Sequence, residues 1–147
     1  METITPLVYL TVRGAGEAIA FYEKAFGAKE IFRLVGPDGK IGHAELALGT
    51  SRIMLSEEYP DFGALSPHTV GGCPMKMHLA VADAEGAVAR AVAAGAMLIR
   101  PVKVEFYGEK TGMVTDPFGF SWFLAEVVEK VTPEEMQRRW DAMMAGS

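Results

Sequence analysis

Two hydrophobic periodicities alternate in the first part of the chain. Apolar residues recur at helical spacing between Ala15 and Phe26, and Gly27 follows where a glycine commonly ends a helix. Segment 29–35 instead alternates with a period of two, which is typical of a strand. The turn Pro37-Asp38-Gly39-Lys40 separates it from the next alternating run. The pattern therefore predicts a helix over 15–26 and strands over 4–12, 29–35, 41–48 and 52–56.

The same order of elements returns in the second half. We expect a strand over 75–81, a helix from Asp83 or Ala84 to Ala94, and strands over 97–99, 110–115 and 120–128, with Pro101 ending the first of these three. A shift of 68 places Gly27-Ala28 on Gly95-Ala96, and a shift of 70 superimposes several lysine, glycine and serine positions. Shared glycine punctuation could also produce such matches. Their agreement in order favours an α+β fold with two tandem βαβββ modules related by a pseudo-twofold axis.

The remaining segments connect or follow the modules. Residues 59–74 are rich in glycine and proline without a sustained period, so we interpret them as a connector between module one (1–58) and module two (75–128). Thr132-Pro133-Glu134-Glu135 is a typical helix start, and a helix is expected over 132–145. Its apolar stripe, which includes Met136 and Trp140, must cover the body of the protein or a partner. All four parts are expected to form a single domain, because the chain has only 147 residues.

Composition narrows the class of protein. Half of the residues are hydrophobic, which supports a folded core rather than disorder. The net charge of −5 and the lack of a basic stripe argue against nucleic-acid binding. No apolar run approaches the roughly 20 residues of a membrane helix, and the first residues do not resemble a signal peptide. Because Cys73 is the single cysteine, no internal disulfide can form, and a cytoplasmic location is expected.

An ordered set of short motifs carries a family resemblance. The motifs are 18–22, 25–28, 37–46, 53–55, 93–96, 106–108, 116–119, 132–135 and 138–139. Taken together, the sequence resembles the vicinal oxygen chelate superfamily, which contains glyoxalases, bleomycin-resistance proteins and extradiol dioxygenases, and is most similar to its PhnB-like branch. The resemblance implies that each module forms half of an open, mostly antiparallel, barrel-like sheet with helices outside and a cleft on the concave face. It also implies a homodimer.

The resemblance also bears on a metal. In metal-using relatives the ligands lie on the first and fourth strands of each module, which correspond here to Leu7 or a neighbour, Ile53, Lys76 and Phe123. Because divalent metals favour imidazole and carboxylate ligands, no metal or other cofactor is expected. The alternative is a divalent metal bound by His43, Glu45 and His78, since His43 and Glu45 lie two apart on one strand and project from the same face.

These observations leave three functional hypotheses open. The first is binding of a small, partly aromatic or apolar molecule in the cleft. The second is a lyase, isomerase or dioxygenase in which His78, or His43 with Glu45, acts as a base or metal ligand, because histidine titrates near neutral pH. The alternative for His78 is a buried structural role. The alternative for His43 and Glu45 is a polar outer face of the sheet. The third is a dimeric interaction module. The candidate ligand-binding residues are Tyr9, Thr11, Lys76, Phe106, Tyr107 and Phe123.

Overall fold

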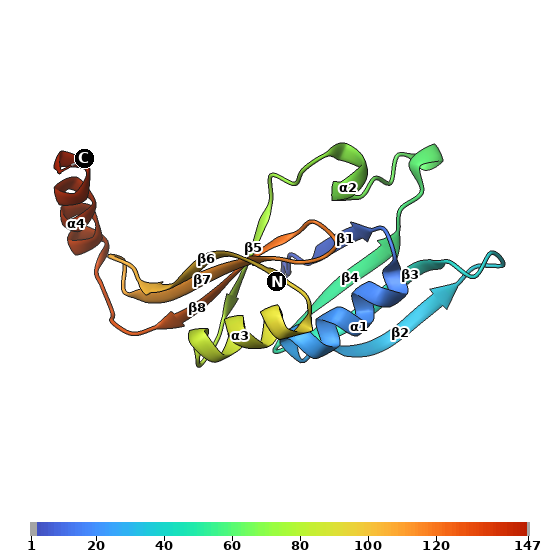
Figure 1. Ribbon diagram of the computed structural model, residues 1–147, viewed down its shortest axis with the longest axis horizontal. Helices are drawn as coiled ribbons and strands as arrows, with labels where there is room; N and C mark the ends of the chain where they lie inside the picture. The colour runs from blue at the N-terminus through green and yellow to red at the C-terminus, as the bar shows by residue number, and fades with distance from the viewer. Residues whose placement is uncertain (1–2, 147) are drawn as a thin grey trace.

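Each half of the chain forms a four-stranded mixed sheet with a helix against one face (Figure 1). The computed structural model describes residues 3–146. The first sheet, sheet one, has the strand order β1-β4-β3-β2, and the second, sheet two, has the order β5-β8-β7-β6. In both, the first and last strands of the module pair in parallel and the other pairs are antiparallel. The strands are β1 (Val8–Val12), β2 (Lys29–Val35), β3 (Ile41–Leu48), β4 (Ser51–Glu57), β5 (Lys76–Ala80), β6 (Met97–Val104), β7 (Glu109–Thr115) and β8 (Ser121–Val127).

The two long helices of the modules begin and end in similar ways. Helix α1 (Ala15–Phe26) and helix α3 (Ala84–Ala94) are followed by Gly27 and Gly95, both at positive φ. The last strand of each module supplies a carboxylate to its helix N-terminus. Glu57 accepts hydrogen bonds from the backbone N–H groups at the start of α1 (2.9 Å each), and Glu126 accepts one from the start of α3 (3.0 Å). These carboxylates satisfy N–H groups that lack partners within the helix and face the positive end of its dipole.

A buried carboxylate links the modules. Asp116, 3% exposed, follows β7 and accepts a hydrogen bond from the Tyr22 hydroxyl of α1 (2.6 Å) and one from the Trp122 indole of β8 (2.9 Å). Its other oxygen accepts the backbone N–H groups of Phe118 and Phe120. Burial raises the pKa of Asp116, and these four hydrogen bonds oppose the rise. Burial also raises the pKa of Tyr22 well above its ordinary value, with the nearby Asp116 charge as a further cause.

The structure confirms the tandem βαβββ arrangement and corrects several details. The prediction that Pro101 ends a strand after residue 99 is wrong, because β6 continues to Val104. β6 is an edge strand, and its pairing with β7 is irregular on both sides of Arg100, which is where a sheet tolerates proline. β1 begins at Val8 rather than Ile4. In its register with β4, which starts at Ser51, Ile4 and Thr5 have no partner, and Pro6 has no backbone N–H to donate.

The segment between the sheets contains more structure than its composition suggests. It forms a short 3₁₀ helix, η1 (Pro60–Phe62), and one turn of helix, α2 (Pro67–Val70). Glu58 holds this segment, because it accepts hydrogen bonds from the Thr69 hydroxyl (2.6 Å) and the Ser66 backbone N–H (3.0 Å). These contacts, the hydroxyl first, lower the pKa of Glu58 from 4.5 to about 2. His68 is exposed, and its Nε2 bonds the Pro117 carbonyl oxygen (2.8 Å).

The C-terminal helix α4 (Pro133–Ala145) lies beyond the end of sheet two, away from α1 and α3 (Figure 1). The predicted Thr132 cap is present, with its side chain accepting the Glu135 N–H. Arg139 fastens the helix by donating to Glu129 and to the Phe106 carbonyl oxygen, and the Trp140 ring lies 5.7 Å from the Phe106 ring. Across residues 3–146, no helix is long and apolar enough to cross a membrane.

Candidate functional site

Sheet one carries a chain of hydrogen-bonded polar side chains on the face opposite α1, which we call its open face. The Tyr9 hydroxyl lies 2.8 Å from His43 Nδ1, and His43 Nε2 lies 2.9 Å from a Glu45 carboxylate oxygen. The other Glu45 oxygen accepts from Arg52 (3.1 Å). The strand order explains the contact, because Tyr9 on β1 is level with Met54 on β4, which in turn is level with Glu45 on β3.

The donors and acceptors of this chain are mutually consistent. If Tyr9 donates its hydroxyl proton to Nδ1, His43 carries its own proton on Nε2 and donates it to the Glu45 carboxylate. The arrangement then aligns a phenol, an imidazole and a carboxylate, as in a nucleophile–base–orienter triad. Tyr9 is 47% exposed, so its hydroxyl end is accessible, whereas His43 and Glu45 are half-buried. The same-face prediction for His43 and Glu45 is thus confirmed, and Tyr9 joins them.

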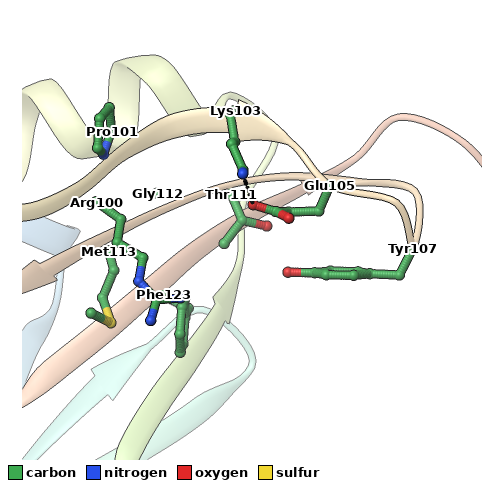
Figure 2. Close-up of a pocket in the computed structure, with 9 residues that line it drawn as sticks. All are labelled: Arg100, Pro101, Lys103, Glu105, Tyr107, Thr111, Gly112, Met113 and Phe123. Carbon is green, nitrogen blue, oxygen red and sulfur yellow. Dashed lines mark ion pairs between the residues drawn. The ribbon is translucent and has the colours of Figure 1, made fainter. Parts of the chain in front are cut away.

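Sheet two forms a pocket on its own open face, opposite α3. The pocket has a volume of about 490 Å³, within the size range of small-molecule sites. Figure 2 shows Phe123 and Met113 side by side below the strands, with the Arg100 side chain reaching toward them and the Tyr107 ring at the opposite end. The lining residues are Arg100, Pro101, Lys103, Glu105, Tyr107, Thr111, Gly112, Met113 and Phe123.

Four of the six predicted ligand-binding residues line two separate hollows, and the other two lie outside both. Phe123 and Tyr107 line the pocket of sheet two. Tyr9 and Thr11 instead line a shallower hollow of about 190 Å³ that the connector and Phe120 complete. Phe106 turns toward α4, where its ring contacts Trp140, and lies outside the pocket lining. Lys76 is exposed on β5, paired in register with Ser121.

His78 lies apart from the polar chain of sheet one. It sits on β5 level with Phe123, its side chain is 52% exposed, and its Nε2 lies 3.7 Å from a Glu109 oxygen. The interpretation of His78 as a buried structural histidine is therefore wrong. The opposite face of β5 is the buried one, because the neighbouring Met77 packs in the core. His78 therefore presents its imidazole at the open face, beside the Glu109 carboxylate.

In the described part of the chain, the candidate metal ligands are not brought together. Within residues 3–146, no group of three His, Cys, Asp or Glu side chains is placed to hold a metal ion. His43 and Glu45 bond each other on sheet one, whereas His78 belongs to sheet two. Ile53, assigned above to a ligand position, packs in the core, and the neighbouring Met54 shares the open face with Tyr9. The three candidate ligands are thus not assembled in one protomer.

Several pocket residues escaped the sequence analysis. Arg100, Lys103, Thr111 and Met113 all face the pocket, yet none belongs to a recognisable motif. Ending the strand before Pro101 removed residues 100–104 from the sheet. Had β6 been continued through Pro101 as an edge strand, residues 100–104 would have been placed beside β7. The pairing of Arg100 with Met113 also depends on the register irregularity after Leu98, since a regular ladder would put Arg100 level with Gly112.

Two tandem βαβββ sheets, each with an open face, define the fold class of this protein. The chain belongs to the Glyoxalase/Bleomycin resistance protein/Dioxygenase superfamily, whose family model matches residues 3–124. An uncharacterised protein of Mycobacterium bovis is 38% identical over 132 residues, covering 88% of this chain and 87% of the relative. An uncharacterised protein of Arabidopsis thaliana is 31% identical over 140 residues, covering 89% of this chain and 82% of the relative.

Solved structures share the fold. The X-ray structure of an Arabidopsis thaliana gene product has a TM-score of 0.67 at 31% identity, covering 86% of this chain and 99% of the other. The fosfomycin resistance protein FosX from Listeria monocytogenes, solved as a mutant with Mn(II) and dihydroxypropylphosphonic acid, has a TM-score of 0.66 at 16% identity, covering 95% and 99%. At that identity the second likeness concerns the fold alone.

Proposed function

We propose that the protein binds a small, partly aromatic or apolar molecule in the pocket of sheet two, without a bound metal. The observation that carries the proposal is the pocket of about 490 Å³ with Phe123 and Met113 as its apolar wall. Apolar walls with a few placed polar groups are typical of ligand sites. The side chains level with each other across β5, β8 and β7 support binding without a metal. They are His78, Phe123 and Met113, and among them only the histidine is a usual metal ligand.

The proposal extends to the family branch and the assembly. The motifs 37–46 and 116–119 support membership of the PhnB-like branch. The edge strand β2 supports a homodimer, because exposed apolar edges favour pairing with another chain. Its exposed apolar residues are Ile31, Phe32, Leu34 and Val35. Equilibrium sedimentation tests the dimer. A twofold mass that Leu34→Lys lowers to a single chain supports it, and a single-chain mass for the unaltered protein contradicts it.

Ligand binding is tested directly with a panel of small aromatic compounds. Thermal-shift hits on the full chain, measured with and without a chelator, should stabilise it equally in both conditions. Phe123→Ala should abolish the shifts because it removes the apolar wall. Phe62→Ala is the matched control, since Phe62 is exposed on η1 and does not line the pocket. Shifts that disappear with the chelator, or that survive Phe123→Ala, contradict the proposal.

A second candidate function is proton transfer at Tyr9. The Tyr9–His43–Glu45 hydrogen-bond chain favours it, because the imidazole can take the phenol proton while the carboxylate holds the ring in place. This is the lyase or isomerase alternative in a metal-free form. A screen of substrates with an acidic C–H bond tests it. Turnover that falls at least about a hundredfold in both Tyr9→Phe and His43→Gln supports catalysis. Turnover that survives either change refutes it.

A further inference from the structure

The pocket of sheet two holds a cation without a partner. Among residues 3–146, Arg100 makes no ion pair and no side-chain hydrogen bond, although ion pairs are common elsewhere on the surface. Lys103, the other cation of the lining, lies 3.8 Å from the Glu105 carboxylate. The charges of Lys103 and Glu105 therefore offset each other, and the guanidinium of Arg100 is the net charge of the pocket.

A buried hydroxyl in the same pocket also lacks a partner. Thr111 is 6% exposed, and its Oγ1 is the buried side-chain polar atom that finds no hydrogen bond in the described part of the chain. Buried polar groups normally have partners, so an orphan hydroxyl in a pocket wall points to a group that comes from outside the chain. Thr111 and Met113 are two residues apart on β7, so their side chains lie on one face.

The third feature is the apolar wall. Met113 is level with Arg100 on one side and with Phe123 on the other. In Figure 2 the Arg100 side chain runs toward Phe123, so the cation lies beside the aromatic ring rather than out over the edge of the sheet. A ligand that contacts Phe123 therefore comes within reach of the guanidinium.

From these features we infer that the pocket selects acids. The oxyanion of an aromatic or apolar acid pairs with the Arg100 guanidinium and accepts a hydrogen bond from the Thr111 hydroxyl. The apolar part of the acid lies against Phe123 and Met113. A guanidinium suits this role because its planar fork of donors matches a carboxylate. The overall charge of −5 gives no general attraction for anions, so a preference for acids must arise locally. The inference rests on the proposed function, since it assigns a substrate class to the same pocket.

Matched pairs of acids and amides test it. The probes are benzoate against benzamide, phenylacetate against phenylacetamide, and naphthoate against naphthamide, each titrated into the full chain and followed by backbone amide NMR shifts. Each pair has nearly the same shape and differs in charge. We expect the acids to bind at least about tenfold more tightly, the effect of one charge-assisted hydrogen bond, with shifts on β7 and β8.

Substitutions locate the preference. Arg100→Gln should abolish it while leaving amide binding unchanged, and Arg100→Lys should retain part of it. Thr111→Val, which removes the hydroxyl at constant shape, should weaken the acids about tenfold. Arg138→Gln is the control, because it removes the same charge from α4, outside the pocket.

The outcomes separate this inference from the proposed function. Equal binding of acids and amides, or a preference for acids that survives Arg100→Gln, overturns the inference and leaves the proposed function standing. Binding of no probe at the pocket overturns both. A well-dispersed amide spectrum of each variant verifies that it is folded.

Discussion

The link between Tyr22 and Asp116 should contribute measurably to stability. Tyr22→Phe removes one hydroxyl and keeps the ring that packs beside Trp122 and Phe118. The lost hydrogen bond is 2.6 Å long, fully buried at Tyr22, and ends on a carboxylate. Hydrogen bonds to charged groups contribute about 1.5–3 kcal/mol, so we expect the free energy of unfolding to fall by that amount. Asp116 keeps three other donors, which limits the loss.

The assay is urea unfolding at neutral pH, in which the expected loss lowers the midpoint by about 1 M for a typical slope. Tyr59→Phe is the matched control, because the Tyr59 hydroxyl has no hydrogen bond to another part of residues 3–146. It should change the free energy of unfolding by less than about 0.5 kcal/mol. A Tyr22→Phe effect as small as that of Tyr59→Phe would refute the argument that Asp116 needs this donor.

The same pair has a definite pH dependence. Because burial raises the pKa of Asp116 in the folded state, folding favours the protonated form, and stability declines as pH rises from the unfolded value through the folded one. The Tyr22 hydrogen bond stabilises the ionised carboxylate and lowers that folded pKa. Tyr22→Phe should therefore cost more at neutral pH than under acidic conditions in which Asp116 is protonated. An equal cost at both would indicate that Asp116 stays neutral throughout.

Three further predictions concern the framework. Glu57→Ala removes the acceptor of two backbone N–H groups at the start of α1 and should lower the free energy of unfolding in urea by about 1–2 kcal/mol. No loss would show that water replaces the carboxylate. Gly108→Ala should lower the free energy of unfolding by more than about 2 kcal/mol, because φ is +90° and the new methyl meets the Glu129 carbonyl oxygen. Gly39→Ala, with open space around it, should lower it by about 1 kcal/mol. Equal losses would contradict the steric argument. Glu58, with its pKa lowered to about 2, stabilises the fold above its ordinary pKa of 4.5 and loses that contribution as pH falls from 4.5 to about 2. Glu58→Gln should therefore flatten the pH dependence of the urea midpoint in this range. An unchanged slope would rule out this role.

Most of the helices and strands were predictable from short stretches of the sequence. The bounds of α1, β2 and β3 coincide with the predicted ranges, because glycines and turn residues mark each end and the period within each is clear. The error at Pro101 has a nonlocal cause. Proline ends a central strand but not an edge strand, and whether a strand lies at an edge depends on the order of the whole sheet.

The candidate sites were harder to predict because they join residues far apart in the chain. The shared face of His43 and Glu45 follows from their spacing along β3. Their contact with Tyr9 requires that β1 pair with β4 and β4 with β3, in one register. The orphan hydroxyl of Thr111 is likewise invisible in the sequence, since it depends on what packs around it.

Comparison of equivalent rows in the two sheets shows where the modules differ. The row Tyr9, Met54, Glu45, Phe32 of sheet one corresponds to the row His78, Phe123, Met113, Arg100 of sheet two. In sheet one the polar members bond one another through His43, so their hydrogen-bonding capacity is largely used within the chain. In sheet two, Met113 occupies the position that corresponds to Glu45, and Arg100, which has no ion-pair partner among residues 3–146, lies at the end of the row. Unused polar groups beside an apolar wall are what a ligand can satisfy, so ligand selectivity should reside in module two, while the polar chain of module one fixes the shape of its own open face.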